Sequence, residues 1–76
     1  MKTSLDLINL AGLGTALIVD AKNLSTLDLI NIVGIIGLKE SHITIRNADL
    51  KTTLDLMQIS SIYPKNITLD LTDSID

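Results

Sequence analysis

A short motif occurs three times along this chain, and it limits the possible folds more than any other feature. Each copy has two hydroxyl residues followed by Leu-Asp-Leu, and the copies span residues 3–7, 25–29 and 52–56. The residues that follow each copy also agree in character without a gap. Repetition at this spacing is typical of solenoids built from one supersecondary unit. We therefore expect a single domain over residues 1–76, with units at about 3–23, 24–49 and 50–73.

Each motif has the features of a helix start. Its first hydroxyl can accept a hydrogen bond from a backbone N–H as an N-cap. The aspartate three residues later can bond back to the cap, and it meets the positive end of the helix dipole. The predicted caps are Thr3, Ser25 and Thr52, and the aspartates are Asp6, Asp28 and Asp55. The sequence therefore predicts three helices with the same start.

A stretch of alternating apolar and polar residues follows each helix and predicts a strand, at residues 16–22, 42–48 and 66–72. Strands that are buried on both faces form continuous apolar runs, whereas these stretches are half polar. Helices should therefore cover one face only. The face toward the helices would carry Leu17, Val19, Ala21, Ile43, Ile45, Asn47, Ile67, Leu69 and Leu71. The open face would carry Ile18, Asp20, Lys22, Thr44, Arg46, Ala48, Thr68, Asp70 and Thr72.

These units predict an α/β fold with two layers. Consecutive parallel strands are joined by right-handed crossovers, so helices that all lie on one side require the strand order 1-2-3. The fold expected is thus three helix–strand repeats, with a three-stranded parallel sheet and helices on one face. A sheet of this kind has two free edges, and a free edge invites pairing with another chain.

The strand segments resemble the corresponding part of leucine-rich repeats. Leu17-x-Val19 is followed by Leu24, and Ile43-x-Ile45 is followed at the same offset by Leu50. The asparagine position of the family pattern holds Lys22, Ala48 and Thr72 instead. The resemblance covers most of the chain and is one of architecture. It implies a binding scaffold whose contacts lie on the exposed face of the sheet.

Composition narrows the classes of function. The chain has no cysteine, and its single histidine, His42, cannot form a zinc site alone. The formal net charge of −3 and the scattered basic residues argue against nucleic acid as a partner. A hydrophobic content of 46% in so small a domain suggests that some apolar surface is shared with another protein chain. We expect no cofactor, no metal and no enzymatic activity.

The beginning of the chain admits two interpretations. Lys2 and the apolar residues 7–19 resemble a secretory signal, yet the same residues align with the two later units. We favour the first folded unit. The longest fully apolar run, residues 32–38, is far shorter than the roughly 20 residues that cross a bilayer. The expected location is the cytoplasm, without membrane insertion.

Three apparent motifs have simpler explanations. Gly12-Leu13-Gly14 follows a helix, whereas phosphate-binding glycines precede one, so a left-handed helix end is favoured. Residues 4–7 are similar to the Asp-Ser-Leu site of acyl carrier proteins, but Thr3 stands where the aspartate is needed and those carriers are all-helical. Asp70, Asp73 and Asp76 lack the dense oxygen-ligand loop of a calcium site and predict a solvated acidic tail.

The open sheet face is the candidate site. Strands in register would place Arg46 between Asp20 and Asp70, beside a row of Ile18, Thr44 and Thr68. One interpretation is a cross-strand charge ladder with a structural role. The other is a docking patch for a protein partner, which predicts a small non-enzymatic binding module of inhibitor, immunity or adaptor type. The alternative function is a self-assembling repeat protein that oligomerises through its sheet edges. With two free sheet edges, we expect a homodimer formed through an edge strand or the exposed face of a terminal helix, whereas a monomer would favour binding of a different protein.

Overall fold

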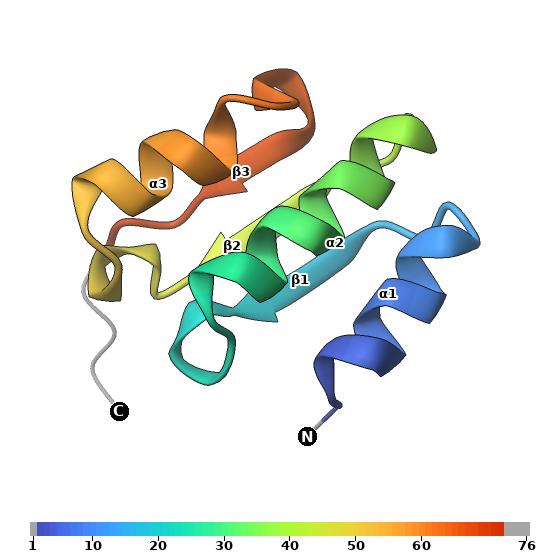
Figure 1. Ribbon diagram of the computed structural model, residues 1–76, viewed down its shortest axis with the longest axis horizontal. Coiled ribbons are helices and arrows are strands. Elements are labelled where there is room, and N and C mark those ends of the chain that lie inside the picture. Colours follow the sequence, from blue (N-terminus) through green and yellow to red (C-terminus); the bar gives the residue numbers. More distant parts are fainter. Residues whose placement is uncertain (1, 73–76) are drawn as a thin grey trace.

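The computed structural model describes residues 2–72 and consists of three helix–strand units. The sheet is parallel in the order β1-β2-β3, and all three helices lie on the same face of it (Figure 1). The predicted fold class is therefore confirmed. The elements are α1 (Ser4–Gly12), β1 (Leu17–Asp20), α2 (Thr26–Leu38), β2 (Ile43–Arg46), α3 (Thr53–Ser60) and β3 (Ile67–Leu69). Short 3-10 helices occupy Ala21–Asn23, Ala48–Leu50 and Pro64–Asn66.

The three helices begin as their motifs predict. The side chains of Thr3, Ser25 and Thr52 accept hydrogen bonds from the backbone N–H three residues later. In α1 and α2 the aspartate side chain also accepts from the backbone N–H of the cap, which completes a capping box. The helix end at Gly12-Leu13-Gly14 is confirmed as well, because α1 stops at Gly12 and Gly14 has a left-handed φ of 84°.

The hydrophobic core lies between the middle unit and its two neighbours. Leu29, Ile32 and Ile36 of α2 are fully buried, as are Ile43 and Ile45 of β2. These elements have a neighbour on both sides, whereas α1 and α3 each have a helix on one side only (Figure 1). Burial of aliphatic side chains is the main stabilising contribution in a chain without disulfides. The middle unit therefore holds the two outer units together.

The strands are shorter than predicted, because a 3-10 helix begins soon after β1 and after β2. The second strand has one extra residue at this point. Asn47 stands between β2 and its 3-10 helix with a left-handed φ of 56°, whereas Ala21 follows β1 directly. Strands β1 and β2 are therefore paired with an offset of 26 residues, whereas the turns that follow them correspond with an offset of 27.

Because of this extra residue, two predictions from the sequence are wrong. Ala48 corresponds to Ala21 and is fully buried, so it does not lie on the open face with Lys22. Leu50 corresponds to the exposed Asn23 and is itself exposed, whereas Leu24 is buried. Leu24 and Leu50 share an offset from their strands in the sequence but differ in packing. One inserted residue is enough, because it shifts every later residue of this turn by one place relative to the first unit, so that Lys51 and not Leu50 takes the place of Leu24.

Candidate protein-binding surface

The six candidate residues lie along the open face of the sheet. The register pairs Ile18 with Thr44 and Thr44 with Thr68. It also pairs Asp20 with Arg46. Asp70 follows β3 directly and continues the ladder, since its backbone N–H donates to the carbonyl of Ile45. Two rows of three side chains therefore cross the sheet, as the strand alternation predicts.

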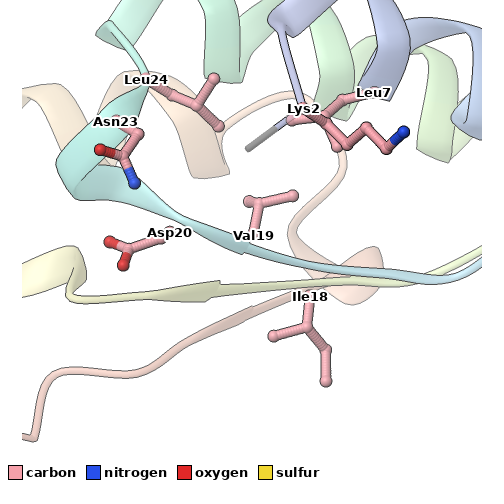
Figure 2. A pocket seen from close by; sticks show the side chains of 7 residues that line it. All are labelled: Lys2, Leu7, Ile18, Val19, Asp20, Asn23 and Leu24. Carbon is pink, nitrogen blue, oxygen red and sulfur yellow. The ribbon is translucent and has the colours of Figure 1, made fainter.

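Exposure differs among these residues. Ile18 is 73% exposed, and Figure 2 shows its side chain on the opposite side of β1 from Val19. Arg46 and Thr68 are exposed, and the other candidates are half-buried. Thr68 is also held in place, because its Oγ1 lies 2.8 Å from Nε2 of His42. The open face thus presents an uncovered apolar side chain close to an uncovered guanidinium.

The carboxylate of Asp20 is held by the turns at the end of the sheet. Oδ1 accepts hydrogen bonds from Nδ2 of Asn47 and from the backbone N–H of Lys22, each 2.9 Å long. These two bonds, together with the positive charges of Lys22 and Arg46, lower the pKa of Asp20 below its ordinary value. Asp20 is therefore fixed in orientation and ionised at neutral pH.

The carboxylate of Asp70 is held in a similar way by its own turn. Oδ1 accepts hydrogen bonds from the hydroxyl and from the backbone N–H of Thr72. These bonds lower the pKa of Asp70, and the charge of Arg46 lowers it further. The predicted column of Asp20, Arg46 and Asp70 is therefore present. However, the hydrogen bonds of both carboxylates go to turn residues, and Arg46 acts on them through its charge.

The helical layer carries a second exposed row that the sequence analysis missed. Leu5, Leu27 and Leu54 hold equivalent places in the repeated motif, and they are 64%, 66% and 68% exposed. Each lies in the first turn of its helix. The capping role of the motif does not indicate in which direction this leucine points. A helical wheel for each unit would have placed it away from the buried positions.

An open groove lies at each outer edge of the fold, one beside β1 and one beside β3; these edges are called the β1 end and the β3 end. At the β1 end, a groove of about 200 Å³ lies between the start of α1 and the strand (Figure 2). Its apolar walls come from Leu7, Val19 and Leu24, and Lys2 lies at its rim. At the β3 end, a groove of about 330 Å³ has Leu56, Met57, Leu69 and Leu71 among its walls. Both grooves lie where a further helix–strand unit would pack.

The described residues offer few other sites. Across residues 2–72, no group of three or more metal-ligating side chains lies close enough together to hold a metal ion. In that same part of the chain, no helix combines the length and the apolar character that crossing a bilayer requires. Of the three aspartates in the predicted acidic tail, Asp73 and Asp76 lie outside the described residues.

Comparison with protein-family models, with curated proteins and with solved structures finds no match for this chain. Its possible function therefore has to be inferred from its own surface.

Proposed function

We propose that this protein is a small non-enzymatic binding module that docks a partner protein on the open face of its sheet. The observation that supports this proposal is the exposed Ile18 beside the charged column centred on Arg46. Arginine and large apolar side chains contribute most of the energy in many protein interfaces. An inhibitor, immunity or adaptor protein would use such a surface. The cytoplasmic location predicted from the sequence is part of the proposal.

The partner that this face suits has an acidic group opposite Arg46 and an apolar pocket for Ile18. Asp20 and Asp70 are ionised and border Arg46, so a partner must bring its negative charge to the guanidinium alone. The bordering carboxylates would repel a broad acidic surface. This arrangement favours specificity over strength, as complementary charges generally do at interfaces.

The test begins with enrichment of partners from the source cells on immobilised protein. The enriched partner is then purified, and its dissociation constant is measured by calorimetry. We expect Arg46→Ala and Ile18→Ser each to raise the dissociation constant about tenfold or more. The stability cost of Arg46→Ala should be only about 0–1 kcal/mol, because exposed charge pairs contribute little.

Leu27→Ser is the matched control, because Leu27 is similarly exposed but lies on the helical layer. It should leave the dissociation constant unchanged. If Leu27→Ser weakens binding and Arg46→Ala does not, the docking surface is the leucine row on the helices. If neither open-face variant changes the dissociation constant, the proposed use of the sheet face is wrong.

A second candidate function is self-assembly through the sheet edges. It is favoured by the two apolar grooves at the ends of the sheet, where Met57 and Leu71 are exposed. Exposed apolar surface of this kind marks interaction sites in soluble proteins.

A further inference from the structure

The apolar positions exposed at the two ends are buried or half-buried in the other units. Ile32 of α2 and Ile59 of α3 are fully buried, but the equivalent Leu10 of α1 is 37% exposed. At the helix position two residues earlier, Ile8 and Ile30 are half-buried, but the equivalent Met57 of α3 is 63% exposed. Leu10 therefore faces the side where a preceding unit would pack, and Met57 faces the side of a following unit. Each end surface suits another unit of the same kind, which a second copy of the chain could supply.

Polar side chains hold each unit to the one before it. Asn47 bonds to Asp20, and Nζ of Lys51 donates to the carbonyl of Leu24 across 2.7 Å. In the third unit, Nδ2 of Asn66 donates to the carbonyl of Ser41, also across 2.7 Å. The bonds from Lys51 and Asn66 satisfy backbone carbonyls where the units meet, and the bond from Asn47 joins two side chains.

The first unit has only one of these bridging side chains. Lys2 precedes its cap as Lys51 precedes Thr52, whereas the position of Asn66 is taken by Ala16 and the extra residue Asn47 has no counterpart. Head-to-tail stacking of two copies would therefore lack two of the three bonds that hold the internal units together. It would also place Asp20 of one copy beside Asp70 of the other, without an arginine between them.

The groove at the β3 end is lined by Leu56, Met57, Leu69 and Leu71 together with the polar residues Asp49, Lys51, Thr53 and Ser60. Of its two charged residues, Lys51 is already engaged by the carbonyl of Leu24. In a parallel ladder, alternate residues direct their backbone groups to the same neighbour. Asp70 directs its N–H and C=O to β2, so those of Leu69 and Ile67 point to the free edge. This edge therefore offers backbone donors and acceptors together with apolar side chains.

We propose that two copies of the chain pair through their β3 edges around a two-fold axis. The inference deepens the self-assembly function above and does not depend on docking at the open sheet face. Antiparallel pairing centred on Thr68 joins Ile67 of one copy to Leu69 of the other and makes a six-stranded sheet. Asp70 then lies opposite Asn66 of the second copy, so the carboxylates that oppose head-to-tail stacking stay apart. The two α3 helices lie side by side and cover Met57. The assembly closes as a dimer.

The first experiment measures oligomeric state by light scattering at high micromolar concentration. The full chain should have twice the mass of one chain. Met57→Lys should raise the dissociation constant of the dimer about tenfold or more. Leu27→Lys is the matched control, because Leu27 is similarly exposed but lies on α2, one helix away from the β3 edge. It should leave the dimer intact. A monomeric wild-type chain, or species that grow beyond a dimer, would overturn the proposal.

The second experiment locates the interface through a disulfide, which the cysteine-free chain makes simple. Opposed residues that are not hydrogen-bonded to each other lie about 4.5 Å apart between Cα atoms, which permits a disulfide. Thr68→Cys should therefore form a covalent dimer under mild oxidation, whereas Ile18→Cys at the β1 edge should not. Cross-linking at Ile18→Cys, or at neither position, contradicts the inference. Arg46→Ala should leave this cross-link unchanged. The experiment therefore distinguishes a failure of the proposed partner docking at the open face from a failure of the proposed dimer at the β3 edge.

Discussion

Nδ2 of Asn47 donates a hydrogen bond to Oδ1 of Asp20 across 2.9 Å, and this bond joins the first two units where their lengths differ. Asn47 is the extra residue after β2, and its backbone is left-handed. Asparagine adopts this conformation more readily than most residues because its short side chain bonds locally. The insertion lets Ala48 enter the core as Ala21 does, although the strands and the turns have different offsets.

Substitutions at Asn47 should separate its two roles. Asn47→Gly keeps the left-handed backbone but removes the bond to Asp20, so the free energy of unfolding should fall. Asn47→Val adds backbone strain and should lower it by a further 1–2 kcal/mol or so. Urea denaturation measures both variants. Combining Asn47→Gly with Asp20→Ala should cost less than the sum of the two single changes. Strict additivity would show that the bond does not contribute to stability.

The N-caps should each contribute measurably to stability. Ser25→Ala or Thr52→Ala removes the acceptor for the backbone N–H of Asp28 or Asp55, which should cost about 0.5–2 kcal/mol. Thr53→Ala is the control for Thr52→Ala, because Thr53 is exposed and is the first residue inside α3. Its effect should stay within about 0.5 kcal/mol. Equal denaturant midpoints for Thr52→Ala and wild type would contradict the capping role.

Acid should destabilise the protein through its bonded carboxylates. Hydrogen bonds lower the pKa of Asp6, Asp20 and Asp70 in the folded state below the ordinary value of 3.8. The stabilisation is therefore complete above that value and is lost as the pH falls through the lowered folded-state pKa. Unfolding measured from neutral pH down to strong acid should show this decline. Asp20→Asn should make the decline shallower, and an unchanged slope would exclude Asp20 as a contributor.

Two glycines in α2 should respond in opposite directions to alanine. A Cβ at Gly37 would overlap the ring of Tyr63, so Gly37→Ala should cost about 1–3 kcal/mol. A Cβ at Gly34 meets nothing within 4 Å. Gly34→Ala should therefore raise the free energy of unfolding by about 0.5–1 kcal/mol through helix propensity. Thermal melting gives the order of the two variants, and a Gly37→Ala protein as stable as wild type would show that the Tyr63 ring moves aside at little cost.

The amino-acid sequence by itself determined the helix starts, the strand order and the open-face register. Caps at Thr3, Ser25 and Thr52 depend on residues within one turn, and the alternation of each strand reports which faces are covered. Tertiary structure alone decided where the extra residue of the second unit lies. Periodicity could not place it, because an insertion anywhere between Arg46 and Thr52 gives the same repeat spacing.

The partners of the carboxylates on the open face also depend on tertiary structure. The sequence correctly placed Arg46 between Asp20 and Asp70, but Asn47 and Thr72 provide their hydrogen bonds. Such bonds depend on turn geometry over a few ångströms, which residue spacing does not encode.

The exposure of apolar side chains at the β1 and β3 ends also depends on tertiary structure. Met57 and Leu10 follow the same apolar pattern as their less exposed equivalents in the other units, and they are exposed because no neighbouring unit among the described residues covers them.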